Sequence, residues 1–334
     1  MAIDKKYIEQ FINVTTKAAL ASSFYVGQKN KDLADQAAVD AMRSELNKLN
    51  INGQIVIGEG ELDEAPMLYI GEKLGVGDGP NFDIAVDPLE GTNFAANNLP
   101  GALSVIAIAE KNNLFKAPET YMNKIAINSN NKEIVDLDFS IKKNIHNLAE
   151  SLNKTPNEIT ACLLDRPRHK KIIDELRDLK VNLKLISDGD VSGALLVCDN
   201  KYKVDIFLGI GGGPEGVLAA SALDSFDCFF QGRFIFDNDE NQKRASSMGI
   251  KDFNKKYELK EIVSGDSLFC ATGITSGDLV KGVSKKDNKF TTETFVTHKS
   301  TNFKKIVTKQ VIIKTWLKAL DTIKDRNLVP SSIG

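Results

Sequence analysis

The chain has 334 residues, of which 42% are hydrophobic and 26% charged, so it is long enough to bury a large core and is not expected to be disordered. Its 43 basic and 45 acidic residues leave a net charge of -2, which excludes the broad basic surface of a nucleic-acid-binding or membrane-surface protein. No apolar run approaches the ~20 residues needed to span a bilayer, so we expect no nucleic-acid partner and no membrane partner.

The N-terminus contains no export signal, because the first six residues lead into an amphipathic stretch rather than an apolar block. The cysteines are scattered without paired spacing, which favours buried free thiols over disulfides or metal ligands. They are Cys162, Cys198, Cys228 and Cys270. The cytoplasm is the simplest location for such a chain.

Predicted helices and short strands alternate in the first third of the chain. Residues 5 to 49 predict two helices, because apolar residues in the second recur at helical spacing on one face. A strand is predicted over 54–57 and a helix from about Ala65 to Leu74. The next strand, 82–86, is predicted to end at Asp87-Pro88, because proline cannot continue a central ladder. A pair of strands follows near 102–109 and 124–128.

The middle of the chain alternates between helix and strand, which is typical of an α/β layer. The predicted helices are 140–153, 168–179, 190–198 and 214–226, and the predicted strands are 159–164, 181–186 and 204–209. The C-terminal third returns to strands over 290–297 and 303–313. Because no linker divides the chain, we expect one catalytic unit, 1–334. Its expected parts are two lobes, about 1–150 and 151–315, that meet near residues 140 to 158, and a C-terminal extension, 316–334.

Acidic residues gather where three predicted strands end. These places are Gly58 to Glu61, Asp87 to Thr92 and Gly211 to Gly216. Ligands of open α/β sheets bind in the crevice at strand ends, so the three loops are expected to converge on one site. The alternative is that they are ordinary solvated turns, since Asp, Glu, Gly and Pro are turn residues.

The carboxylates of these loops are of the type that hard divalent cations prefer. They belong to Glu59, Asp87, Glu90 and Glu215, and their flanking glycines let the backbone approach a ligand closely. The hydroxyl of Thr92 lies beside this group, where it would orient an attacking water or react itself. Composition and spacing do not choose a phosphatase over another metal-dependent enzyme.

Five segments, in the same order along the chain, resemble the class II fructose-1,6-bisphosphatases. They are residues 55–73, 83–92, 166–169, 188–190 and 209–216. The resemblance covers roughly residues 10 to 310. The Asp87-Pro-Leu-Glu-Gly-Thr92 segment also resembles the wider lithium-sensitive phosphatase superfamily, which includes inositol monophosphatases. The segment 55–73 is narrower and points to class II.

The resemblance implies an α/β fold, a layered α/β/α/β/α sandwich of the sugar-phosphatase type with the active site between two lobes. It implies two divalent ions, Mn²⁺ or Mg²⁺, held by Asp35, Glu59, Asp87, Glu90 and Glu215. It implies substrate contacts from Glu90, Gly91, Thr92, Tyr121, Arg166, Pro167, Arg168, Asp188, Gly189, Asp190 and Gly212. Thr92 is implied to be the catalytic hydroxyl, and Lys31 an electrostatic contributor to catalysis.

Some of these residues have simpler explanations when the pattern is taken alone. Asp35 would be a helix cap or a first-turn acid. The basic run 166–171 would be the solvated face of a helix, although two arginines at a helix start also suit phosphate capture. The resemblance favours capture of the phosphate that is not cleaved, and His169 receives no catalytic role. Asn93 departs from the family, where many relatives carry arginine, so the local phosphate field is expected to be weaker.

The expected activity is hydrolysis of the 1-phosphate of fructose 1,6-bisphosphate, a reaction of gluconeogenesis, to fructose 6-phosphate and phosphate. The alternatives are activity on sedoheptulose 1,7-bisphosphate or an inositol monophosphate, and a metabolite-binding regulator without turnover. The expected partner is a small sugar bisphosphate, and the expected assembly is a homo-oligomer, either a dimer or a tetramer.

Overall fold

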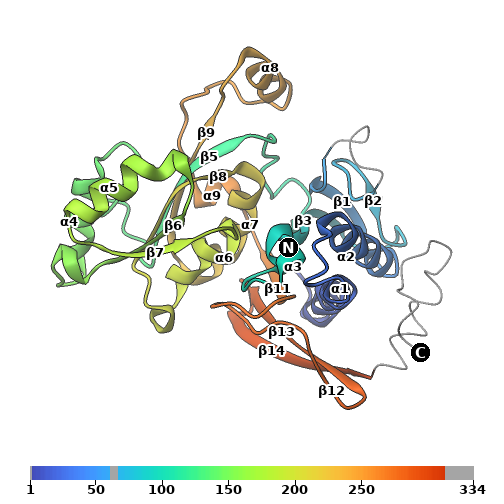
Figure 1. The fold of residues 1–334 in the computed structure, drawn as a ribbon. Helices are drawn as coiled ribbons and strands as arrows, with labels where there is room; N and C mark the ends of the chain where they lie inside the picture. Colours follow the sequence, from blue (N-terminus) through green and yellow to red (C-terminus); the bar gives the residue numbers. More distant parts are fainter. Residues whose placement is uncertain (1, 61–66, 313–334) are drawn as a thin grey trace.

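The computed structural model describes residues 2–60 and 67–312. Two β-sheets alternate with layers of helices (Figure 1). The α-helices are α1 (Lys6–Ser23), α2 (Lys31–Leu46), α3 (Thr92–Asn97), α4 (Ile141–Ser151), α5 (Lys170–Asp178), α6 (Asp190–Leu195), α7 (Gly213–Leu223), α8 (Asp239–Ser247) and α9 (Leu259–Ile262). No helix in these two described ranges is both long enough and apolar enough to cross a membrane.

The first sheet has the strand order β12-β13-β11-β4-β3-β1-β2, and β14 pairs with β13. Its strands are β1 (Asn52–Ile57), β2 (Lys73–Leu74), β3 (Asn81–Glu90), β4 (Leu103–Glu110), β11 (Ser267–Gly273), β12 (Ser284–Lys286), β13 (Lys289–His298) and β14 (Phe303–Ile312). β1 and β3 are parallel, and the other pairs are antiparallel.

The second sheet has the strand order β10-β9-β5-β8-β6-β7. Its strands are β5 (Tyr121–Ile127), β6 (Thr160–Leu164), β7 (Asn182–Ile186), β8 (Ile206–Gly212), β9 (Phe229–Ile235) and β10 (Tyr257–Glu258). β6 is parallel to both β7 and β8, whereas β5 is antiparallel to β8 and β9.

Alternating residues of the first sheet face different layers, because successive side chains of a strand point to opposite faces. In β4, Ile106 and Ile108 pack with α1 and α2, whereas Val105 and Ala107 face the middle of the molecule. The middle core also holds apolar residues of α7, which contacts strands of both sheets. Small residues on this face, such as Ala107, let α7 lie close to the sheet.

The outer face of the second sheet is covered by α4 and α5, whose Ile145, Leu148 and Leu176 pack with Ile125 and Leu163. Together with α1 and α2 on the far side and α7 in the middle, this gives the order α/β/α/β/α (Figure 1). The predicted fold class is therefore confirmed.

Several predicted elements differ from the structure in extent or pairing. Residues 67–72 form turns and 73–74 form β2, so the predicted helix 65–74 is wrong there; its first two residues lie outside the described residues. The strands predicted near 102–109 and 124–128 exist as β4 and β5 but belong to different sheets. The predicted strand 303–313 is present as β14, and its last residue lies outside the described part.

The two sheets draw on the chain in three pieces. β5 belongs to the second sheet, and β11 to β14 return to the first sheet after the second has been built. The sheets therefore do not follow the lobes 1–150 and 151–315 at these two places. The single catalytic unit stays a prediction, and the extension 316–334 with Trp316 lies outside the described residues.

Candidate active site

The acidic loops of the first sheet lie at one edge because β1 and β3 are parallel. Glu59 follows the end of β1 by two residues, and Glu90 is the last residue of β3. Carboxyl ends of parallel strands meet at the same edge, which brings these two side chains to one side of the sheet.

β3 continues past Pro88 because its pairing with β4 is irregular at this point. The pairing of β3 with β4 shifts between Asp87 and Glu90, and the pairing with β1 ends at Ala85. Pro88 therefore needs no ladder hydrogen bond on the β1 side, which is why the expected end of the strand at Asp87-Pro88 is wrong. Such a bulge re-aims side chains, and here it lies between the two predicted ligands of this loop.

The predicted metal ligands form one electrostatic group. Burial raises the pKa of Asp87 well above its ordinary value, and the charges of the other four raise it further. These four are Glu90, Glu59, Glu215 and Asp35. Burial and nearby acids also raise the pKa of Asp35 to about 6 and that of Glu59 to about 8. Carboxylates that disfavour one another's charge in this way are stabilised by a cation.

Glu90 is buried and only half satisfied. Its Oε1 accepts a hydrogen bond from the backbone N–H of Val191 at 2.6 Å. Its Oε2 is buried and has no hydrogen-bond partner among the described residues. A buried carboxylate oxygen without a donor fits a site that takes a cation.

The acids are near one another but do not form a ready-made metal site. Within residues 2–60 and 67–312, no three Asp, Glu, His or Cys side chains are gathered so that they could hold a metal ion as they stand. Ligation by Asp35, Glu59, Asp87, Glu90 and Glu215 therefore stays a prediction.

Asp35 and Lys31 both come from α2. Asn30 is the cap of this helix, since its side chain accepts from the N–H of Leu33 at 3.1 Å, and Asp32 is the first-turn acid. Asp35 therefore has neither of the structural roles that its position in the sequence suggested. Lys31 is exposed four residues before Asp35, on the same face of the helix. Its part in catalysis stays a prediction.

The predicted sugar-phosphate residues other than Glu90, Gly91 and Thr92 lie at one edge of the second sheet. The ends of the parallel strands β6, β7 and β8 lead to Arg166, Asp188 and Gly212, and the antiparallel β5 begins there with Tyr121. Arg166 Nη2 lies 3.6 Å from Asp188 Oδ1. The strand directions thus bring together residues that are far apart in the sequence.

Arg168 is exposed, but two contacts hold its side chain. Its Nε donates to the carbonyl of Ile210 at 3.0 Å, and its guanidinium lies 4.8 Å from the ring centroid of Tyr121. The preceding Pro167 begins a short 3-10 turn, Pro167–His169. His169 is buried, and both of its ring nitrogens have hydrogen-bond partners: the carbonyl of Leu164 and the backbone N–H of Ile210. It fixes the turn that carries Arg168.

Two site glycines have the same backbone conformation. Gly91 has φ 79° and Gly189 has φ 83°, and each directly precedes a short helix. In this left-handed region a side chain is strained, so glycine is required. The first residues of the two helices are Thr92 and Asp190. Asn93 follows Thr92 and is exposed, and its Oδ1 accepts from Asn97 at 2.9 Å.

A cavity of about 330 Å³ contains three predicted site residues in its wall: Tyr121, Gly212 and Glu215. Glu119 and Asp237 line it as well, and sequence reasoning did not find them. The charge of Glu119 contributes to the raised pKa of Glu59. An acid two residues before a strand gave no signal beyond that of an ordinary loop residue.

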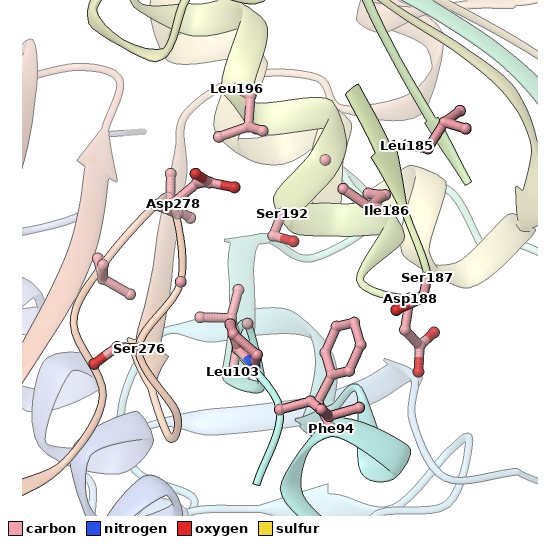
Figure 2. A pocket seen from close by; sticks show the side chains of 17 residues that line it. Phe94, Leu103, Leu185, Ile186, Ser187, Asp188, Ser192, Leu196, Ser276 and Asp278 are labelled. Atoms are coloured by element: carbon pink, nitrogen blue, oxygen red, sulfur yellow. The ribbon is translucent and has the colours of Figure 1, made fainter. Parts of the chain in front are cut away.

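A second, larger cavity of about 430 Å³ lies beside Asp188 (Figure 2). Its lining is largely apolar and includes Phe94, with Ser276 and Asp278 from the loop after β11 on one wall. Phe94 also lies beside two site glycines, and it is close enough to Gly91 to obstruct a side chain there. A Cβ at Gly91 would come within 2.9 Å of its ring, and one at Gly189 within 3.7 Å.

Lys124 is the most unexpected member of the site. It lies in the middle of β5, is buried, and pairs with the carboxylate of Asp190. Its ammonium also donates to the carbonyl of Gly212 at 2.6 Å. The one available sequence signal was a lysine inside an apolar strand.

The remaining histidines and the cysteines have structural environments. His146 is exposed on α4, whereas His298 is buried and lies 3.2 Å from Asp266. The cysteines are buried and free, as predicted; they are Cys162, Cys198, Cys228 and Cys270.

The layered α/β/α/β/α fold, with acidic residues at an edge of the first sheet and arginines at an edge of the second, together with the family match below, defines a sugar-phosphatase-type enzyme. The chain belongs to the bacterial fructose-1,6-bisphosphatases: the profile of the family described as "Bacterial fructose-1,6-bisphosphatase, glpX-encoded" matches residues 5–311. This confirms the class II resemblance, since the relatives below carry that name.

The chain is 43% identical over 312 residues to a "Fructose-1,6-bisphosphatase class 2" of Haemophilus influenzae, covering 89% of this chain and 93% of the relative. It is 43% identical over 301 residues to "Fructose-1,6-bisphosphatase 1 class 2" of Escherichia coli, covering 86% and 89%. A relative from Trichodesmium erythraeum, 40% identical over 312 residues with 86% and 90% covered, is named "D-fructose 1,6-bisphosphatase class 2/sedoheptulose 1,7-bisphosphatase". A solved inositol monophosphatase from Anabaena aligns with TM-score 0.32 and 13% identity over 58% of this chain and 71% of that one.

Proposed function

We propose that the chain hydrolyses the 1-phosphate of fructose 1,6-bisphosphate to fructose 6-phosphate and inorganic phosphate. The observation that carries the proposal is the coupling of Asp87 to all four of the other predicted ligands. One of these, Glu215, lines the same cavity as Tyr121, and the guanidinium of Arg168 lies over the ring of Tyr121. One predicted metal ligand and the tyrosine that Arg168 contacts thus line one cavity.

We propose that two divalent cations, Mn²⁺ or Mg²⁺, bind the acidic group. The donors fit, because Glu90 Oε2 is a buried oxygen without a hydrogen-bond partner among the described residues and the neighbouring carboxylates raise one another's pKa. Asp35, Glu59, Asp87, Glu90 and Glu215 would hold the ions. When bound, such ions polarise the phosphoryl oxygens and stabilise the leaving oxygen.

The chain's own groups bind and orient the substrate in this account. Arg166 and Arg168 hold the phosphate that is not cleaved, since guanidinium groups bind phosphate in a fixed geometry. Asp188 and Asp190 accept hydrogen bonds from sugar hydroxyls. The hydroxyl of Thr92, at the start of α3, orients the attacking water or attacks the phosphorus itself.

Sedoheptulose 1,7-bisphosphate is a second candidate substrate, because the relative from Trichodesmium erythraeum is named for both activities. We further propose a place in gluconeogenesis and a cytoplasmic location, which the free, buried cysteines support. The homo-oligomer, a dimer or a tetramer, stays a prediction.

The test is phosphate release from fructose 1,6-bisphosphate, sedoheptulose 1,7-bisphosphate and an inositol monophosphate, with Mg²⁺ or Mn²⁺ and with EDTA. We expect metal-dependent release that is fastest from the fructose ester. Glu59→Gln keeps the shape of the side chain and should abolish it, whereas the exposed Glu133→Gln should not. Preference for the inositol ester, or full activity of Glu59→Gln, would contradict the proposal.

A further inference from the structure

We propose that Lys124 is a positioning residue for sugar recognition. Its ammonium holds the carboxylate of Asp190 and the carbonyl of Gly212 in the places from which they meet the sugar. The inference rests on the proposed function, from which it takes the sugar contacts of these two residues.

The location of Lys124 requires an explanation. Its side chain is only 1% exposed, and no other lysine or arginine in the described ranges is buried. It lies between β8 and β9 in the sheet, next to Ile125. Taking an ammonium out of water costs several kcal/mol unless good partners replace the water. A buried lysine at this position is therefore stable only if its ammonium keeps these hydrogen-bond partners.

The two partners come from different elements, and both belong to the predicted sugar site. Asp190 is the first residue of α6, 66 positions along the chain, and Gly212 ends β8, 88 positions along. One ammonium thus connects the start of α6 with the end of β8. Segments at a binding site lose less entropy on binding when they are held in place beforehand.

The backbone that Lys124 holds also borders the acidic group. Lys124 donates to the carbonyl of Gly212, and a Cβ at Gly212 would overlap the carboxylate of Glu215, a predicted metal ligand.

The backbone leaves these side chains little room to move. A Cβ at Gly211 would overlap the carboxylate of Asp190, and a Cβ at Gly216 would lie 3.3 Å from Cδ of Lys124. The carboxylate and the lysine stem are therefore enclosed by glycine backbone on two sides. Such packing fixes one arrangement of the pair.

A buried ion pair that only stabilises the fold is the competing explanation, and substrate choice separates the two. We would measure kcat and KM with Mg²⁺ for fructose 1,6-bisphosphate and for p-nitrophenyl phosphate, which has no sugar hydroxyls. For Lys124→Met and for Asp190→Asn we expect the KM for the sugar ester to rise at least about tenfold, because hydrogen bonds to substrate hydroxyls are misplaced or lost. Relative to the parent, kcat/KM should fall at least about tenfold more for the sugar ester than for the aryl ester, which has no sugar hydroxyls to misplace.

The double variant, Lys124→Met with Asp190→Asn, gives the sharper readout. If the lysine acts through Asp190, kcat/KM of the double variant for the sugar ester should be no lower than that of the weaker single variant. Both changes remove the same ion pair, so their effects should not multiply. It also leaves a neutral buried pair, so it should fold even if Lys124→Met alone does not.

Equal losses on both esters, multiplicative losses in the double variant, or a double variant with full sugar activity would each overturn the inference. Failure of the proposed function looks different. The parent protein would then release no phosphate from fructose 1,6-bisphosphate but would hydrolyse another sugar phosphate, on which the same comparison of variants applies.

Discussion

Glu90 accepts a hydrogen bond from the backbone N–H of Val191 at 2.6 Å, and this contact joins the end of β3 to the first turn of α6. β3 belongs to the first sheet, whereas α6 follows a strand of the second. One side chain therefore connects the predicted metal ligands with the predicted sugar residues. Because the end of β3 and the start of α6 meet here, the candidate site contains residues that are far apart in the sequence.

Replacement of Glu90 separates its charge from its hydrogen bond. Glu90→Gln should keep the contact with Val191 and lose the charge, so we expect phosphate release to fall at least about a thousandfold with little change in stability. Glu90→Ala should also destabilise the fold by about 1–3 kcal/mol, because a buried N–H loses its acceptor. Activity assays and urea unfolding measure the two effects. Substantial activity in Glu90→Gln would contradict a ligand role.

The left-handed glycine before Thr92 should not tolerate a side chain. Gly91→Ala introduces strain of about 1–2 kcal/mol and also places its Cβ 2.9 Å from the ring of Phe94. We expect a marked loss of kcat. Gly77→Ala is the matched control: Gly77 has φ 90°, and nothing lies within 4 Å of its Cβ, so it should cost stability alone. Phe94→Leu added to Gly91→Ala should restore part of the activity, and no restoration would contradict the clash.

Arg168 should act on the phosphate that is not cleaved. Arg168→Lys loses the donor to Ile210 and the planar group above Tyr121, so we expect the KM for fructose 1,6-bisphosphate to rise about tenfold. The KM for fructose 1-phosphate, which lacks the second phosphate, should hardly change. Lys170→Gln is the control, because Lys170 is exposed and pairs with Asp174 at 2.6 Å. Equal KM changes for both esters would contradict the binding of the uncleaved phosphate by Arg168.

Asp266 should govern part of the acid lability of the fold. Burial works against its charged form, but hydrogen bonds from His298, from Ser300 and from the N–H of Ile3 outweigh burial and hold its pKa well below the usual range. A depressed folded pKa gives stability that is present above the unfolded pKa of about 4 and is lost as the pH falls below it.

Asp266→Asn should remove this pH dependence. At pH 7 we expect the variant to be less stable than the parent by about 1–3 kcal/mol, because charged acceptors are lost from buried donors. The difference should shrink as the pH falls from about 4 toward the folded pKa. Urea unfolding from pH 3 to 7 measures it, and a difference that grows toward acid would contradict the assignment.

The sequence predicted the features that depend on local pattern. The helical spacing around Met42 and the alternation of helix and strand after residue 140 predicted the layers. Glu59 and Asp87 were predicted as metal ligands because they follow predicted apolar strands, and that role stays a prediction. The proline rule failed at Pro88, because β1 ends before it and leaves it without a ladder partner on that side. Local pattern is least informative where neighbouring strands decide the outcome.

Tertiary contacts account for what the sequence did not predict. Lys124 acquires its role only when β5 lies beside β8 and α6 brings Asp190 to it. Glu119 and Asp237 join the site because separate elements close around one cavity. The spacing of residues within one segment does not predict such contacts between distant segments.

Phosphorus-31 NMR of fructose 1,6-bisphosphate, incubated with the protein and Mg²⁺, tests the central claim most directly. The account predicts that the resonance of the 1-phosphate disappears and inorganic phosphate grows at the same rate, while the 6-phosphate is kept. Loss of the 6-phosphate instead, or no release of phosphate in the presence of the metal ion, would contradict it.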